Sequence, residues 1–171
     1  FASSCSVYYT KIAKAKKTFD ENTPVNPKAP YSLSKRMAEL ALLKMSDKDF
    51  HPVILRAGTV YGFSPRMRYD LVVNTMVKDA ISKRTIMVLA RGEQWRPLVD
   101  IGDLVKTYLT VVDAPEYKTS GQIFNVVFDN FKVGDIAKLV QKALDGNTRV
   151  QIDRLQNYLN DRSYKVSPDK L

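Results

Sequence analysis

FASSCSV, residues 1–7, begins a strand–helix–strand pattern that decides the fold. This run and the run PVILRA, residues 52–57, are short and apolar, and both predict buried strands. Between them, residues 31–45 carry apolar side chains at helical spacing, and Pro30 precedes them at a position that suits the first turn of a helix. A strand, a helix and a second buried strand in this order predict an α/β fold with a mainly parallel sheet.

The same alternation continues through the rest of the chain. Apolar residues at helical spacing predict further helices at 71–82, 103–113 and 133–144. Short apolar runs predict further strands at 85–89, 97–101, 122–128 and 149–152. Residues 11–30 are rich in Pro, Asn and Lys and predict a loop. The pattern contains no internal repeat, so a repeat architecture is not expected.

Composition places the chain among ordinary globular proteins, with 171 residues of which 44% are apolar and 26% are charged. No apolar run approaches the roughly 20 residues that a membrane-spanning helix needs, so we expect no membrane partner. Cys5 is the only cysteine, which excludes an internal disulfide and gives secretion no support. Phe1 does not begin a signal peptide, and we expect a cytoplasmic location.

The net charge of +9 raises the question of a nucleic-acid partner. The one dense cluster of lysines lies within residues 11–17, and the other basic residues are scattered. Neither zinc-finger spacing nor an aromatic RNA-binding segment accompanies them, so we predict no nucleic-acid binding. A basic surface that attracts phosphorylated small molecules explains the charge as well.

A candidate proton-transfer site lies at the start of the first predicted helix. Tyr31 and Lys35 are four residues apart, so a helix places both side chains on one face. A free phenol has a pKa near 10, and a fixed ammonium nearby favours the phenolate and lowers that pKa. A serine hydroxyl at the end of the preceding strand can hold a substrate hydroxyl in line for proton removal. The spacing alone is weak evidence, because a chain with nine tyrosines and abundant lysine contains such a pair by chance.

Five motifs give this pair more weight. They are SSCSVYY (3–9), DENTPVNPKAPYSLSK (20–35), LRAGTVYG (55–62), RPLVDIGDL (96–104) and DRSYKVSPDK (161–170). In kind and in order they resemble the extended short-chain dehydrogenase/reductase family, the NAD-dependent sugar-nucleotide epimerases and dehydratases. The resemblance runs the full length of the chain. It implies a partial Rossmann-like parallel sheet and a smaller α/β lobe that binds a nucleotide sugar.

The resemblance also implies catalytic roles. Tyr31 is similar to the catalytic base of the family, and Lys35 to the lysine that binds the cofactor ribose and lowers the pKa of the tyrosine. Ser4 stands where the family has its catalytic serine or threonine, close to the substrate; the other interpretation is a strand-end hydroxyl bonded to backbone. The implied cofactor is NAD or NADP.

Three further residues are candidates for contact with the substrate. Thr59 stands where epimerases often have an asparagine against the substrate phosphates. Arg96 resembles the family arginine that pairs with the nucleotide diphosphate, for which a planar forked donor is suited. Arg162 is a weaker phosphate or ribose candidate, and a surface arginine is an equal interpretation. The implied partners are a nucleotide sugar and, because family dimers pair through helices such as 31–45, a second copy of the chain.

Departures from the family pattern narrow the expected reaction. Dehydratases of the family have Asp-Glu directly after the catalytic threonine, where this chain has Cys5 and Ser6, so dehydration is not expected. Epimerases similar to GDP-fucose synthase use a Cys and a His, but His51 is far along the chain from the expected place, so Cys5 is interpreted as a core or site-lining residue. No cysteine, histidine and carboxylate cluster has metal spacing, and no metal is implied. The 4-epimerase or 4-reductase chemistry, which needs Ser, Tyr, Lys and NAD, remains.

The glycine-rich phosphate loop of the family is missing from the sequence. The resemblance therefore implies that residues 1–62 are the C-terminal part of an NAD-binding domain. Residues 63–171 are then mainly the substrate lobe, with 97–113 returning to the first part. We expect this chain by itself to bind NAD poorly and to turn over nothing. Two other classes stay open, a nucleotide-sugar binding module without chemistry and a structural remnant of such an enzyme.

Overall fold

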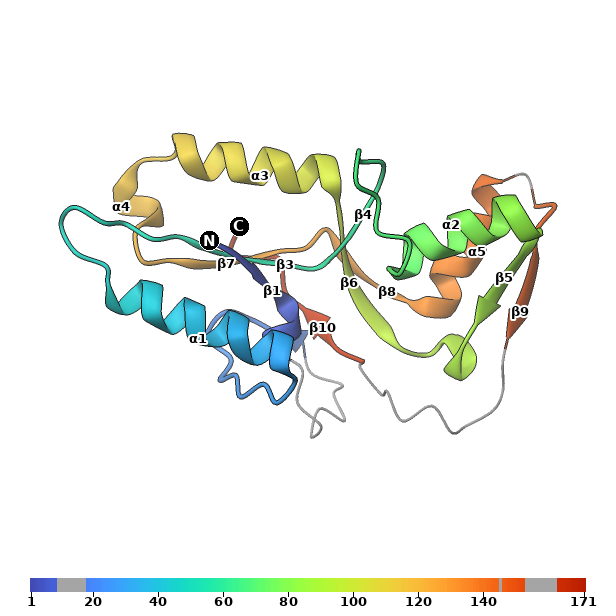
Figure 1. The fold of residues 1–171 in the computed structure, drawn as a ribbon, viewed down its shortest axis with the longest axis horizontal. Coiled ribbons are helices and arrows are strands. Elements are labelled where there is room, and N and C mark those ends of the chain that lie inside the picture. Colours follow the sequence, from blue (N-terminus) through green and yellow to red (C-terminus); the bar gives the residue numbers. More distant parts are fainter. Residues whose placement is uncertain (9–17, 145, 153–162) are drawn as a thin grey trace.

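The computed structural model describes residues 1–8, 18–144, 146–152 and 163–171. The molecule is elongated, with a sheet between two long helices at one end and a lobe of two helices and two strands at the other (Figure 1). Strands and helices alternate along the chain, and the predicted α/β fold class is confirmed.

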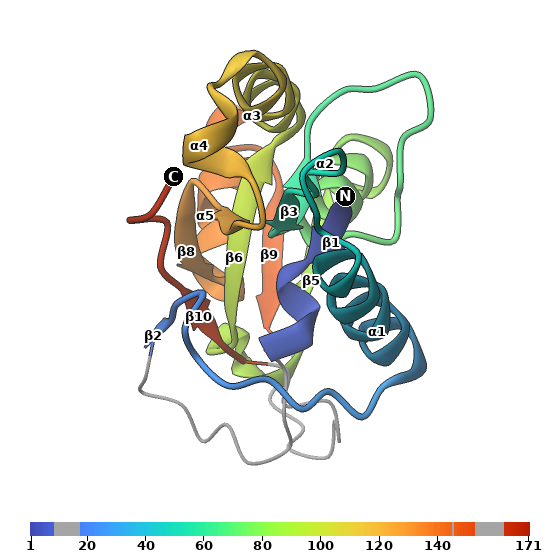
Figure 2. The ribbon, with the colours of Figure 1, turned by 90° about the vertical axis from the view of Figure 1, so that its left-hand side faces the viewer.

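The first sheet consists of three parallel strands in the order β1-β3-β7. Their bounds are Ala2–Ser4, Ile54–Ala57 and Ile123–Val126. Helix α1, Pro30–Lys44, lies on one side of this sheet and helix α3, Ile101–Asp113, on the other (Figures 1 and 2). The short helix α4, Glu116–Thr119, leads from α3 into β7. The carboxyl ends of the three strands therefore lie at one edge of the sheet.

Helix α3 begins directly after a strand because its first turn is capped by a side chain. The carboxylate of Asp100 accepts the backbone N–H of Gly102 at 2.7 Å, which satisfies one of the free donors at the helix start. Its inner side chains, Leu104, Tyr108 and Val111, pack against the sheet residues Leu55, Val99 and Val126.

A second sheet of three strands lies next to the first, and the chain passes between them at Gly58. The second sheet has the order β4-β6-β8, with β4 parallel and β8 antiparallel to β6. The bounds are Thr59–Tyr61, Trp95–Asp100 and Asp129–Lys132. A Cβ on Gly58 would lie 2.9 Å from the carbonyl oxygen of Pro97, so only glycine allows this approach of β6 to the chain between β3 and β4.

The lobe packs two helices on a parallel pair of strands. Helices α2, Val72–Lys83, and α5, Val133–Ala143, cover strands β5, Thr85–Val88, and β9, Arg149–Ile152. The 3-10 turn η2, Ala90–Gly92, connects β5 to β6. The apolar cluster of the lobe core consists of Met76, Ala80, Ile86, Val88, Leu98, Ile136, Ala137 and Val140.

A third small core lies at the end of the first sheet. The 3-10 helix η1, Cys5–Tyr8, follows β1, and strands β2, Thr18–Phe19, and β10, Lys165–Val166, pair in parallel. The buried residues of this core are Cys5, Val7, Tyr8, Val127, Tyr164 and Val166. Through this core the C-terminal residues Tyr164 and Val166 pack against the turn that follows Ser4.

Most predicted elements are confirmed within a few residues; two have corrected bounds, and some short strands are not predicted. The sequence predicts a strand over 1–7, but the strand ends at Ser4, whose Oγ accepts the backbone N–H of Ser6 and so favours a turn. Helix α3 begins at Ile101 rather than at Asp103 because Asp100 caps it. Strands β4 and β8 are not predicted, because both are short and β8 is mostly polar. The two-residue strands β2 and β10 are not predicted either, and β2 lies inside the predicted loop 11–30, because each is defined only by its pairing with the other. The division into residues 1–62 and 63–171 stays a prediction, and in the structure α3 and β7 pack with β1 and β3.

Candidate active site

A pocket of about 520 Å³ opens at the carboxyl ends of β1 and β3. In open α/β sheets this edge is where ligands bind. Five of the six residues predicted for the site line this one pocket: Ser4, Tyr31, Lys35, Thr59 and Arg96. The sixth, Arg162, lies outside the residues that the structure describes.

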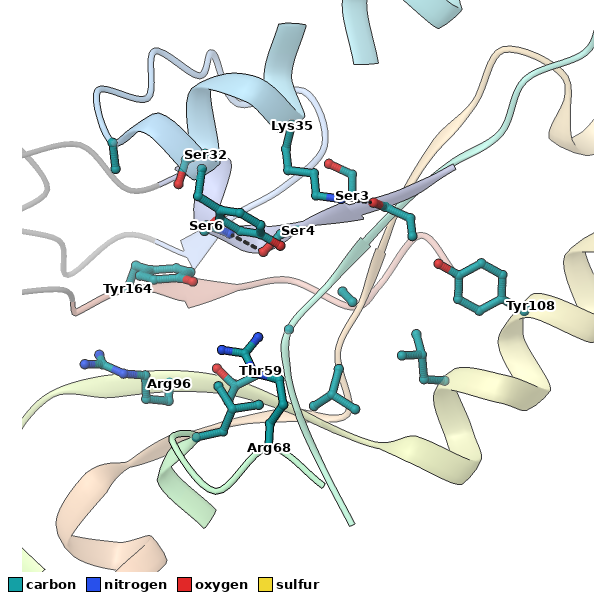
Figure 3. Close-up of a pocket in the computed structure, with 18 residues that line it drawn as sticks. Ser3, Ser4, Ser6, Ser32, Lys35, Thr59, Arg68, Arg96, Tyr108 and Tyr164 are labelled. Atoms are coloured by element: carbon teal, nitrogen blue, oxygen red, sulfur yellow. Dashed lines mark hydrogen bonds between the residues drawn. The ribbon is translucent and has the colours of Figure 1, made fainter. Parts of the chain in front are cut away.

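Ser4 and Lys35 lie on one side of the pocket (Figure 3). Ser4 is the last residue of β1, and its Oγ accepts the N–H of Ser6 at 3.2 Å, which leaves the hydroxyl hydrogen for another partner. The Nζ of Lys35 donates to the carbonyl oxygen of Ala2 at 2.9 Å, and this bond joins α1 to β1.

Tyr31 and Lys35 share a face of α1, as the spacing predicts. The Nζ of Lys35 is 5.8 Å from the centre of the Tyr31 ring, and both side chains line the pocket. Helix α1 begins at Pro30, so Tyr31 is in its first turn and 59% of its surface is exposed. An exposed phenol beside an ammonium at the mouth of a pocket is accessible to a substrate hydroxyl.

Thr59 and Arg96 come from the second sheet and lie across the pocket from Ser4 and Lys35 (Figure 3). Thr59 begins β4 and is the register partner of Leu98 on β6. Arg96 is on β6, and its Nη1 donates to the carbonyl oxygen of Trp95 at 2.8 Å. The pocket thus lies between the two sheets.

Sequence reasoning missed Arg68, which lines the same pocket from the loop between β4 and α2 (Figure 3). Hydrogen bonds to the carboxylate of Asp70, and the charge of that carboxylate, raise the pKa of the Arg68 guanidinium. The loop is held by the buried side chain of Asn74, which donates to the carbonyl oxygen of Arg68 and accepts the N–H of Gly62. No periodic pattern marks a loop arginine, so the sequence offers no signal for it.

The pocket is electropositive. Among its described lining residues, Lys35, Arg68 and Arg96 are cationic, and none is Asp or Glu. Three cations around one pocket favour an anionic ligand, and arginine is well suited to phosphate and carboxylate oxygens.

The structure confirms Cys5 as a core residue. Its side chain is buried, and its Sγ donates to the carbonyl oxygen of Arg56 at 3.0 Å. Burial raises the pKa of the Cys5 thiol well above its ordinary value, more than the nearby Arg56 charge lowers it, so the group stays protonated. His51 lies elsewhere, with its Nδ1 3.2 Å from the Oγ of Ser120 and its Nε2 3.2 Å from a carboxylate oxygen of Glu116.

Two further observations concern metals and membranes. Within the described ranges, no three His, Cys, Asp or Glu side chains are grouped as metal ligands. None of the helices in the described part of the chain is both long and apolar enough to cross a membrane.

Comparison with known proteins identifies the family of this chain. The family described as the NAD dependent epimerase/dehydratase family matches residues 1–126, which carry Ser4, Tyr31, Lys35, Thr59 and Arg96. The chain belongs to this family. Its members are enzymes, and NAD is their cofactor.

Individual relatives include both epimerases and dehydratases. An uncharacterised UDP-glucose epimerase of Bacillus subtilis is 34% identical over 116 residues, covering 67% of this chain and 35% of that protein. The human dTDP-D-glucose 4,6-dehydratase is 29% identical over 150 residues, covering 85% of this chain and 41% of that protein. The chain therefore spans less than half the length of these two relatives.

Solved structures show the same fold. The UDP-glucuronic acid 4-epimerase of Bacillus cereus, in complex with UDP-glucuronic acid and NAD, has a TM-score of 0.77 at 22% identity. The match covers 99% of this chain and 52% of that chain. The UDP-glucose 4-epimerase of Thermus thermophilus, in complex with NAD, has a TM-score of 0.75 at 23% identity, with 99% and 55% covered.

The side chains at the pocket have the hydroxyl and ammonium groups that would suit a ribose of NAD. An ammonium carries three donors, so the bond from Lys35 to Ala2 leaves donors for ribose hydroxyls. Tyr31 and Ser4 add hydroxyl groups at the same edge of the parallel sheet. The sequence has no glycine-rich turn for the pyrophosphate, so this chain's residues fit the ribose end and not the phosphates.

Proposed function

We propose that the chain carries the catalytic residues of an NAD-dependent sugar-nucleotide 4-epimerase or a related oxidoreductase. The observation that carries this proposal is the meeting of Ser4, Tyr31 and Lys35 with Thr59 and Arg96 in one electropositive pocket. These residues come from β1, α1, β4 and β6, which are far apart in the sequence. A nucleotide sugar has both an anionic diphosphate and a hydroxyl to be deprotonated, which matches the two kinds of side chain.

In this proposal the proton is handled by Tyr31. In this role the Tyr31 oxygen takes the proton from the sugar C4 hydroxyl, and the Nζ of Lys35 lies 5.8 Å from the centre of the Tyr31 ring. Ser4 holds the same hydroxyl in line through its Oγ. NAD, when bound, supplies the hydride acceptor for the sugar carbon. Arg96, Arg68 and Thr59 also line the pocket, and in this proposal they bind the diphosphate of the substrate.

Epimerase or reductase chemistry is favoured over dehydration by the residues after Ser4. Cys5 is buried as a thiol, and Ser6 lines the pocket without a carboxylate. Elimination of water needs a general acid and a general base at this place, and neither residue can act as a carboxylic acid. Among the described lining residues there is no Asp or Glu to replace them.

The absence of a glycine-rich turn keeps a second function open. The three cations can bind a nucleotide sugar without Tyr31, which describes a binding module without chemistry. We expect this chain by itself to bind NAD weakly and to be inactive. Its assembly as a homodimer, its cytoplasmic location and the choice between NAD and NADP stay predictions.

The test is the conversion of a UDP-sugar to its C4 epimer, measured with NAD in the longest gene product that contains these residues. Tyr31→Phe is expected to lower turnover about 100- to 10,000-fold, the usual contribution of a general base. The matched control is Tyr117→Phe on α4, whose side chain is exposed and outside the pocket. It is expected to leave turnover unchanged.

Calorimetry with the same UDP-sugar separates the two functions. The enzyme proposal expects Tyr31→Phe to keep its affinity while losing turnover. If the unsubstituted protein binds the UDP-sugar but does not turn it over, the result supports the binding module instead. Undiminished turnover by Tyr31→Phe contradicts the role of this residue as base.

A further inference from the structure

A row of polar side chains crosses the first sheet beneath α1. Ser3, Arg56 and Asn125 are register partners on β1, β3 and β7, so their side chains lie on the same face. All three are buried, with Arg56 1% and Asn125 0% exposed. A sheet face under a helix is normally apolar, so burial of apolar surface does not explain this row.

Glu39 of α1 completes the row. Its carboxylate is fully buried and accepts the Nε and Nη2 of Arg56 at 2.9 and 2.8 Å, a forked contact. The Oγ of Ser3 and the Nη1 of Arg36 also donate to it. Burial acts to raise the pKa of Glu39, but the hydrogen bonds from Arg56 and Ser3 outweigh it, so this pKa lies below its ordinary value. The group is therefore a carboxylate held by four donors.

The third guanidinium nitrogen of Arg56 extends the contacts beyond α1. The Nη1 of Arg56 donates to the hydroxyl of Tyr8 at 2.8 Å, and that hydroxyl donates to the Oδ1 of Asn125 at 2.8 Å. The Arg56 side chain is thus bonded on both sides. A guanidinium fixed in this way offers Glu39 only one geometry.

Apolar packing does little to place α1. Its buried residues are Ser32 and Glu39, while Leu33, Met37 and Leu40 are exposed. Its N-terminus has no side-chain cap. Apolar contacts are non-directional in any case, whereas a forked ion pair specifies position and orientation.

The tie at Glu39 lies close to the candidate catalytic pair. Lys35 and Tyr31 are four and eight residues before Glu39, on the same side of the helix. Lys35 bonds to Ala2 and Glu39 bonds to Ser3, which are consecutive residues of β1. Ser4 comes next, so both ties set the helix against the strand that carries it.

We propose that Glu39, held by Arg56 and Ser3, is a positioning residue that places Tyr31 and Lys35 against Ser4. The proposal deepens the proposed function and rests on it. Glu39 touches neither substrate nor cofactor and acts through α1. Loss of its charge frees the helix to shift, and the bond from Lys35 to Ala2 weakens with it.

Competitive acetylation of lysines in the folded chain tests this placement without any activity measurement. The labelling of Lys35 is measured by mass spectrometry relative to Lys106, an exposed lysine of α3. In Glu39→Gln the ratio is expected to rise about 2- to 10-fold, the factor that corresponds to one net hydrogen bond. Ile86→Val, in the lobe core, is the control and should leave the ratio unchanged.

An unchanged ratio in folded Glu39→Gln overturns the proposal. An equal rise in Ile86→Val also overturns it, because Lys35 would then report only on global stability. Where Glu39→Gln does not fold, Arg56→Lys takes its place, since it keeps the charge but loses the fork. An unchanged ratio in that variant overturns the proposal as well.

Turnover then separates this proposal from the proposed function. In the longest gene product, Glu39→Gln is expected to lower kcat and to leave KM for the nucleotide sugar unchanged, because the proposed contacts to the diphosphate lie across the pocket. A raised labelling ratio with full turnover supports the placement by Glu39 but contradicts the catalytic role of Lys35.

Discussion

The two ends of the molecule are built by different forces. The lobe packs α2 and α5 on β5 and β9 mainly through a cluster of buried apolar side chains. At the other end, α1 meets the first sheet through a buried carboxylate, a buried guanidinium and serine and tyrosine hydroxyls. Both arrangements bury side chains, but only the second joins a helix to a sheet through a buried ion pair.

This difference follows what each end has to do. An apolar core tolerates small shifts of its helices, because its energy depends on area rather than direction. In the function that we propose, the helix that carries Tyr31 has to hold its phenol near the hydroxyl of Ser4, where a shift of about 1 Å matters. Directional contacts at Glu39 suit that demand.

The largest expected effect comes from breaking the buried pair on one side. Arg56→Ala leaves the carboxylate of Glu39 buried without its main partner, and we expect a loss of about 3–5 kcal/mol in the free energy of unfolding. Urea denaturation measures it. The double variant Glu39→Leu/Arg56→Met is expected to recover most of the loss, because no buried charge is left. Equal losses in the single and double variants would contradict this account.

A smaller effect is expected in the apolar core of the lobe. Ile86→Val removes one methylene from a buried site, and we expect a loss of about 0.5–1.5 kcal/mol in the free energy of unfolding. Urea denaturation measures this loss, and NMR spectra of the tyrosine side chains show whether the pocket is disturbed. Signals of the pocket residues should not move, since the core of α2 and α5 is separate from them. Shifts at Tyr31 would show that the two ends are coupled.

The smallest effect is expected at the rim of the polar network. Arg36 donates to the same carboxylate at 3.0 Å, but its side chain is 25% exposed. Arg36→Ala is expected to cost about 0.2–1 kcal/mol, the range of partly solvated ion pairs, because Arg56 still holds Glu39. Urea denaturation of Arg36→Ala and of Arg56→Ala measures the two losses in the free energy of unfolding for comparison. A loss as large as that of Arg56→Ala would mean that burial does not decide the strength of these contacts.

Much of the fold is predictable because its signals are local. Apolar runs mark β3 and β5, and helical spacing marks α1, α2 and α5. Strand β1 is cut short by the hydroxyl of Ser4, an interaction within two residues that apolar character does not reveal. Strands β4 and β8 are defined by pairing with β6 rather than by their own residues.

The candidate site divides in the same way. Tyr31 and Lys35 are detectable because a helix brings residues four apart together, and the order of motifs points to Ser4, Thr59 and Arg96. Arg68 is not detectable, because a loop has no periodicity and its place depends on Asn74. The assignment of Arg162 stays a prediction.

The sequence by itself determined the α/β class and the family resemblance and proposed the candidate acid–base residues, because these depend on spacing within short segments. Only the tertiary structure decided that three cations surround one pocket and that Glu39 joins Ser3 and Arg56. Those partners are 36 and 17 residues from Glu39 in the sequence. Strand register and helix packing bring them together, and neither is encoded in the local pattern around any one of them.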